Sequence, residues 1–239
     1  MKSLKPVRSG TLKASVVHAI RDAIFSGRFH PGDPLRELHL ARDLSVSQPT
    51  VREALFEIEK QGLVVRTPNV GTNVTNLSSD DIRERIELRL LLEKVAAGKA
   101  GERMNEADFR ELERRLALLT TAVAANEYHE SAQADLAFHR HIWTCSGNRT
   151  LSATLDQIAV PLFAFVSLLR SAHSQDLVRV MGSHAAILEA LRKGNRERIE
   201  EVIGQHGNSG YQDFLDSGKP DFRAYLYQNQ DSETVAQRV

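Results

Sequence analysis

The sequence lacks the features that mark secreted, disulfide-rich and membrane-spanning proteins. Its 239 residues include one cysteine, Cys145, which excludes an intramolecular disulfide and fits a reducing compartment. It has no run of about 18 or more apolar residues, so no membrane-spanning helix is expected. The N-terminus, MKSLKPVRSG, has no apolar signal core. These absences favour a cytoplasmic protein without a membrane partner.

Signatures of nucleotide binding and of serine hydrolases are missing too. The chain has no Walker loop, G-x-S-x-G, dinucleotide fingerprint or internal repeat. Its formal net charge is zero, but residues 1–76 hold 11 Lys+Arg against 7 Asp+Glu, and the remainder is acidic. The first segment is therefore the better candidate for an anionic partner.

The first segment has the order helix, helix, three-residue turn, helix, two-stranded wing. Thr11 is a suitable N-cap for the first helix, and Ser26-Gly27 ends it. The other predicted elements are helices over 37–44 and 48–61 and strands over 63–66 and 72–75. Two helices joined by so short a turn present a recognition helix to the major groove of DNA.

The run LRELHLARDLSVSQPTVREALFEIEKQGLVVRTPNVGTNV resembles the winged helix-turn-helix of GntR-type bacterial transcription regulators. The resemblance spans residues 12–75 and implies a homodimer on double-stranded operator DNA, because one such module covers only a half-site. The family usually has arginine where this chain has a glutamine, which can pair with adenine rather than guanine. The alternative for these polar residues is an ordinary solvent-exposed helix face with no DNA contact. The DNA contacts that the resemblance implies are Arg36, Ser47, Gln48, Thr50, Arg52 and, near the wing tip, Gly71.

Residues 77–217 are predicted to form a separate, all-α domain. Ser78-x-x-Asp81 resembles a helix start. Between a basic disordered arm (1–10) and a loosely ordered tail (218–239), the fold is thus mainly α. A winged helix-turn-helix (11–76) precedes an antiparallel bundle of about six helices. These helices are suggested near 80–101, 105–125, 130–146, 148–172, 176–193 and 195–217.

Three histidines and one aspartate lie on the inward, apolar stripes of three predicted bundle helices. They are Asp135 and His139, four residues apart in DLAFHRH, and His184 and His206. Each histidine alone is more often a core residue with satisfied hydrogen bonds. Together with an inward carboxylate they favour a divalent metal site, because the ion makes the burial of Asp135 tolerable. Zinc fits best, with nickel or manganese as alternatives. The other histidines (18, 30, 39, 129, 141 and 173) are predicted on the surface or in loops.

Arg89 shares the apolar stripe of the first bundle helix with Glu93. The two residues can form a structural pair at i,i+4 spacing. Alternatively, the guanidinium can face a cavity and hold a carboxylate through two parallel hydrogen bonds.

Residues 80–217 resemble the FCD ligand-binding domain of the FadR subfamily of GntR regulators. The matching pieces are ELRLLLE (87–93), D-x-x-FH (135–139) followed by GN (147–148), SHAAILEAL (183–191) and His206. The resemblance implies the same four metal ligands and an Arg89 that holds the carboxylate of an effector. Ser183 stands where the family commonly has glutamate.

The sequence thus predicts a transcription regulator, not an enzyme, that responds to a small organic acid bound beside a metal. Three alternatives stay open: a metal-dependent, hydrolase-like enzyme, a regulator with a purely structural metal, and a regulator that senses the metal itself. Against the enzyme, no further inward Glu or His near the ligands suggests itself as a general base.

Overall fold

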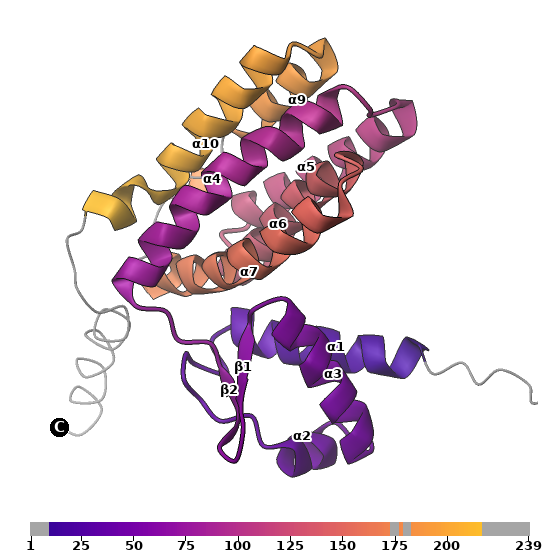
Figure 1. Cartoon of the computed structure of the whole chain (residues 1–239), viewed down its shortest axis with the longest axis vertical. Coiled ribbons are helices and arrows are strands. Elements are labelled where there is room, and N and C mark those ends of the chain that lie inside the picture. Colours follow the sequence, from indigo (N-terminus) through magenta and orange to yellow (C-terminus); the bar gives the residue numbers. More distant parts are fainter. Residues whose placement is uncertain (1–9, 173–176, 179–182, 217–239) are drawn as a thin grey trace, which may run out of the picture. The chain divides into compact units, whose positions relative to one another are not determined.

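The computed structural model describes residues 10–172, 177–178 and 183–216, and the chain divides between Asn76 and Leu77 into two compact units. Figure 1 shows the helices and strands of both units. The predicted arm, apart from Gly10, and the predicted tail lie outside the described residues.

The first unit is a winged helix-turn-helix, as predicted. Its elements are α1 (Gly10–Phe25), α2 (Glu37–Asp43), α3 (Gln48–Lys60), β1 (Val64–Thr67) and β2 (Gly71–Val74). The two strands pair antiparallel, with Val64 opposite Val74 and Thr67 opposite Gly71. The prediction of Thr11 as the N-cap of the first helix was wrong, since α1 already includes Gly10 and Thr11 lies inside the helix.

A small apolar core fixes the orientation of α3. Val51, Leu55 and Ile58 of this helix are fully buried, and their spacing places them on one side of it. At its start, the Ser47 hydroxyl accepts a hydrogen bond from the Thr50 amide at 3.3 Å. The buried side and the cap leave the opposite side of α3 to solvent.

The second unit is a helical bundle, as predicted. It contains α4 (Ser79–Gly101), α5 (Glu106–Ala124), α6 (Tyr128–Cys145), α7 (Arg149–Ala172), α9 (His184–Lys193) and α10 (Arg196–Asp216). Helix α6 packs between α5 and α7, and α4 packs against α10 and α7 (Figure 1). Ser78 and Asp81 form a capping box at the start of α4, which confirms the predicted helix start.

The predicted helix over 176–193 needs a correction, because α9 begins only at His184. Residues 177–178 are helical, Ser183 is in a turn, and 173–176 and 179–182 lie outside the described residues. Serine favours positions just before a helix over its interior. The Ser183 hydroxyl lies 2.7 Å from Nδ1 of His206 on α10. Helical periodicity along one segment cannot predict such a contact with another helix.

Glycines let α10 lie close against α4. A Cβ atom on Gly101 would lie 2.5 Å from Cδ1 of Ile199. A Cβ atom on Gly207 would overlap the side chain of Leu90. These small residues bring the neighbouring His206 into the bundle core.

Helix α7 contains a stretch, Arg149–Leu168, that is long and apolar enough to cross a membrane by length and composition. The sequence prediction overlooked it, because the stretch includes polar residues and is no unbroken apolar run. However, 61% of the apolar part of this stretch is buried inside the bundle. The following large apolar side chains of α7 are buried and belong to the core of this unit: Leu151, Leu155, Leu162, Phe163, Phe165 and Val166.

Candidate metal centre and DNA-binding surface

The four predicted metal ligands converge in the core of the bundle. Asp135 and His139 come from α6, His184 is the first residue of α9, and His206 lies on α10. All four are buried. Each offers a ligand atom, and these atoms lie within 4.8 Å of one another.

The spacing of the donor atoms suits a first-row divalent ion. Asp135 Oδ1 lies 2.8 Å from His184 Nε2 and 3.3 Å from His139 Nε2. The Nε2 atoms of His139 and His206 are 3.1 Å apart. Ligands at about 2.0–2.2 Å from one ion stand roughly 3–3.5 Å from each other. Little movement would therefore bring these donors around one ion.

Two imidazole rings are held by partners on their outer nitrogens. Nδ1 of His139 lies 3.1 Å from Oε1 of Glu93, and Nδ1 of His206 lies 2.7 Å from Oγ of Ser183. With Nδ1 engaged in this way, Nε2 of each ring is directed at the cluster. Sequence reasoning missed both roles, although Glu93 was placed on the inward stripe and Ser183 was noted as a departure from the family.

Three residues of the cluster, Asp135, His139 and His206, have strongly shifted pKa values. Burial opposes a charge on His139, but the carboxylates of Glu93 and Asp135 outweigh it and raise the pKa of His139 to about 9. Burial lowers the pKa of His206 well below its usual value, assisted by the charges of His184 and His139. Burial would raise the pKa of Asp135, but the charge of His184 and hydrogen bonds from His139 and His184 bring it well below the usual range. A carboxylate and a neutral imidazole are the forms that bind metals.

Arg89 is joined to the cluster through Glu93. It is 3% exposed, its Nε lies 3.1 Å from Glu93 Oε2, and its Nη1 donates to the Tyr211 hydroxyl. Its guanidinium also lies over the ring of Phe163, 4.3 Å from the centroid. Burial raises the pKa of Glu93, but Arg89 and His139 outweigh it and bring that pKa to about 2. The i,i+4 pair of Arg89 and Glu93 considered from the sequence therefore exists. The Tyr211 hydroxyl accepts a hydrogen bond from a further N–H of the same guanidinium.

A second inward acid thus stands beside the ligands, contrary to the sequence-based argument against an enzyme. Glu93 contacts His139 and also accepts a hydrogen bond from Trp143 Nε1 at 3.0 Å. An acidic carboxylate held by an arginine, an imidazole and an indole is a poor general base, because these donors stabilise its charged form.

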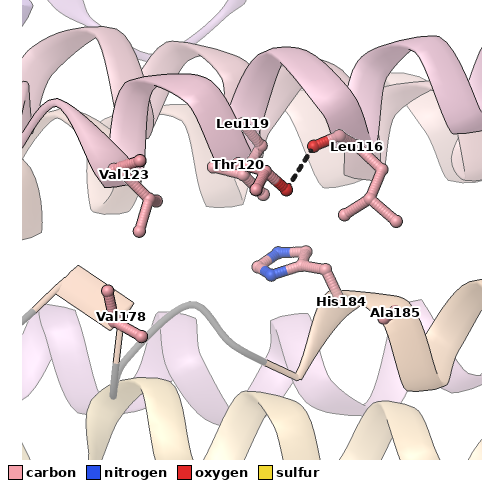
Figure 2. Close-up of a pocket in the computed structure, with 8 residues that line it drawn as sticks. Leu116, Leu119, Thr120, Val123, Val178, His184 and Ala185 are labelled. Carbon is pink, nitrogen blue, oxygen red and sulfur yellow. Dashed lines mark hydrogen bonds between the residues drawn. The ribbon is translucent and has the colours of Figure 1, made fainter.

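An apolar cavity of about 270 Å³ reaches the cluster from the side of α5. Figure 2 shows the ring of His184 directed across it toward α5. Arg89 is not among the described residues that line it. These are Leu116, Leu119, Thr120, Val123, Ala124, Val178, His184 and Ala185.

Four of the six predicted DNA contacts, Ser47, Gln48, Thr50 and Arg52, lie at the start of α3. Gln48 Nε2 and Arg52 Nη2 both donate to Oε2 of Glu37 at 2.8 Å, which sequence reasoning did not foresee. The hydrogen bond from Arg52 lowers the pKa of Glu37 despite some burial. Glu37 thereby aligns two side chains that were predicted to read DNA.

Of the remaining predicted DNA contacts, two lie outside the start of α3 and are exposed, and two form a hydrogen bond with each other. Arg36 and Gly71 are exposed, and Gly71 has a φ of +121° at the wing, a conformation that favours glycine. Ser47 and Thr50 lie 2.8 Å apart through their hydroxyl oxygens, in addition to the helix cap. These two therefore have a structural role at the start of α3, whatever they contact in DNA.

A winged helix-turn-helix followed by a separate helical bundle is the architecture of a DNA-binding transcription regulator with a second, all-α domain. Residues 12–74 match the family described as bacterial regulatory proteins, gntR family, and residues 84–209 match the FCD domain. The chain therefore belongs to the FCD-containing, FadR-type GntR regulators, which are not enzymes.

Individual relatives agree with this assignment. The HTH-type transcriptional repressor RspR of Escherichia coli K12 is 26% identical over 204 residues, covering 82% of each chain. The HTH-type transcriptional regulator LutR of Bacillus subtilis is 27% identical over 203 residues, covering 77% of this chain and 92% of LutR. The structure of E. coli McbR/YncC superimposes with a TM-score of 0.71 at 22% identity, over 85% of this chain and 98% of that one. This last likeness concerns the fold alone.

Proposed function

We propose that this protein is a cytoplasmic, metabolite-responsive repressor that binds a pseudo-palindromic operator as a homodimer. In this proposal the buried centre of the bundle tightly binds one divalent metal, with zinc as the first choice, and the bundle also binds a small organic acid that changes operator affinity. The observation that carries the proposal is the convergence of four buried donor residues in the bundle core. Glu93 contacts one of them, His139, and also pairs with the buried Arg89. The sign of regulation follows RspR, which is named as a repressor.

The residues present fit a metal ion. Asp135, His139, His184 and His206 would hold it, and a bound ion would supply positive charge that attracts an anionic ligand. Glu93 and Ser183 would keep two imidazoles in orientation. In the absence of an ion, His139 is protonated at neutral pH, so ion binding must displace a proton from it. Metal affinity should consequently rise with pH up to about 9.

Loss of one ligand should empty this centre. We expect wild-type protein to retain about one first-row divalent ion per chain after desalting, and His184→Ala and His206→Ala to lose it. Elemental analysis with circular dichroism as a folding check measures this. His129→Ala serves as the control, because His129 is outside the cluster and pairs with Glu130. Equal metal contents in wild type and both ligand variants would rule the centre out.

An exposed apolar stripe on α4 supports the homodimer. Leu88, Leu91 and Val95 are 48%, 57% and 40% exposed, and their spacing places them on one side of the helix. A row of large apolar side chains in water is typical of an interface. A second copy of the chain is the natural occupant, because a pseudo-palindromic operator requires two DNA-binding units.

A charge in this stripe should dissociate the dimer. Leu91→Glu would bring two carboxylates into an apolar contact, so we expect a monomer and a loss of cooperative operator binding. Analytical ultracentrifugation and gel-shift titration measure the two effects. Leu118→Glu is the matched control, since Leu118 is equally exposed, at 52%, but lies on α5. A dimeric Leu91→Glu protein would place the interface elsewhere.

A further inference from the structure

Helix α6 carries a second pair of metal-ligand residue types, turned away from the buried centre. His141 and Cys145 are four residues apart, as Asp135 and His139 are, and point toward the start of α5. There they meet Asp108, and the donor atoms of the three residues lie within 4.8 Å of one another. All three residues are half-buried. The sequence had placed His141 on the surface and gave Cys145 no role.

The spacing of these donors is that of a zinc site. Sγ of Cys145 and Nε2 of His141 are 3.6 Å apart. Zinc binds thiolate sulfur at about 2.3 Å and imidazole nitrogen at about 2.0–2.1 Å, so a tetrahedral ion separates the two donors by about 3.6 Å. We propose that Asp108, His141 and Cys145 form a second site for a thiophilic divalent cation of the zinc class.

The charges of these residues also suit such an ion. A thiolate and a carboxylate balance the two positive charges, so the occupied site is neutral and its partial burial costs little. Sulfur and imidazole ligands select zinc-like ions over magnesium or calcium. Three protein donors leave a position for water, and the half-buried location lets the ion exchange with solvent.

The surroundings hold two of the donors in place. Oδ2 of Asp108 accepts a hydrogen bond from the Asn105 amide at 3.0 Å in the capping box of α5. Nε2 of His141 lies 2.9 Å from the backbone carbonyl oxygen of Asp108. On ion binding, the ring exchanges the hydrogen bond to this carbonyl for the ion. An ion at this position would join the start of α5 to the end of α6, the helix that also carries Asp135 and His139.

Cobalt(II) titration tests the proposal directly, because Cys145 is the only cysteine in the chain. A near-ultraviolet thiolate-to-cobalt absorption band can therefore arise only from this residue. With cobalt in excess, we expect wild type to bind about two ions per chain, one more than it retains after desalting, and to show the band. Cys145→Ser should lose the band and one ion. His184→Ala should lose the other ion and keep the band, which separates this site from the proposed function.

A second variant and a second readout guard against a folding artefact. The amide of His141→Gln can still donate to the Asp108 carbonyl but is a poor zinc ligand, so the band should disappear while the helical content stays. Zinc should also slow alkylation of Cys145 in wild type and not in His141→Gln. The absence of a cobalt–thiolate band in wild type, or a band that persists in His141→Gln, would overturn the proposal.

Discussion

Arg52→Ala will bind operator DNA roughly 5- to 100-fold more weakly than wild type, as is typical when a base-reading arginine is lost. The side chain of Arg52 is 56% exposed on α3, where Glu37 aligns it beside Gln48. Removing it should leave the fold intact, because the buried side of α3 is made by other residues, such as Val51 and Leu55. Fluorescence anisotropy with a selected operator at about 0.15 M salt measures the effect.

Lys60→Ala is the matched control for Arg52→Ala. It removes the same charge from the same helix, but at the C-terminal end of α3, and its ammonium group lies over the ring of Phe56. A general electrostatic contribution would weaken both variants alike, whereas base reading would weaken only Arg52→Ala. If Arg52→Ala bound as tightly as wild type, the assignment of the recognition helix would be wrong.

Helical periodicity was sufficient to place the four donors of the candidate metal centre on inward faces, where the structure has them buried. Asp135 and His139 are one turn apart, and the apolar neighbours of His184 and His206 determine the direction of their stripes. Periodicity also gave the order of the helices, and the Ser78-x-x-Asp81 motif gave the capping box at the start of α4. These features are local, so a single sequence contains them.

Contacts between distant segments were beyond the sequence. Glu93 meets Trp143 across 50 positions, and Arg89 meets Tyr211 across 122. The face that His141 presents was misjudged for the same reason: its partner, Asp108, comes from the preceding helix. A polar residue on the side of a helix can be placed on a face by its spacing, but its partner depends on tertiary packing.

Arg89→Ala will abolish the response to the organic acid while metal and operator binding persist. Arg89 is buried, and its charge is stabilised by Glu93 and Tyr211. Burial lowers its pKa, but the Glu93 carboxylate outweighs this, so the guanidinium stays cationic. A carboxylate beside the metal centre would replace the Tyr211 hydroxyl as partner of Nη1, since a charged acceptor binds arginine more strongly than a phenol. Losing this contact should cost about 2–5 kcal/mol, or roughly 30- to several-thousand-fold in affinity.

Two further variants distinguish an Arg89 that binds the effector carboxylate from an Arg89 that only pairs with Glu93. Arg89→Lys keeps a positive charge beside Glu93 and should fold normally. It should nevertheless bind the acid nearly as poorly as Arg89→Ala, because an ammonium group cannot form the two parallel hydrogen bonds that a guanidinium makes to a carboxylate. Tyr211→Phe removes the competing hydroxyl and leaves the arginine, so its acid affinity should equal or exceed that of wild type. Calorimetric titration of small mono- and dicarboxylates into all four proteins, with and without operator, measures these affinities. If the best wild-type ligand bound Arg89→Ala within about twofold of wild type, a difference under ~0.5 kcal/mol, Arg89 would be only the partner of Glu93 and Tyr211. The effector site would then have to be sought elsewhere, beginning with the apolar cavity beside His184.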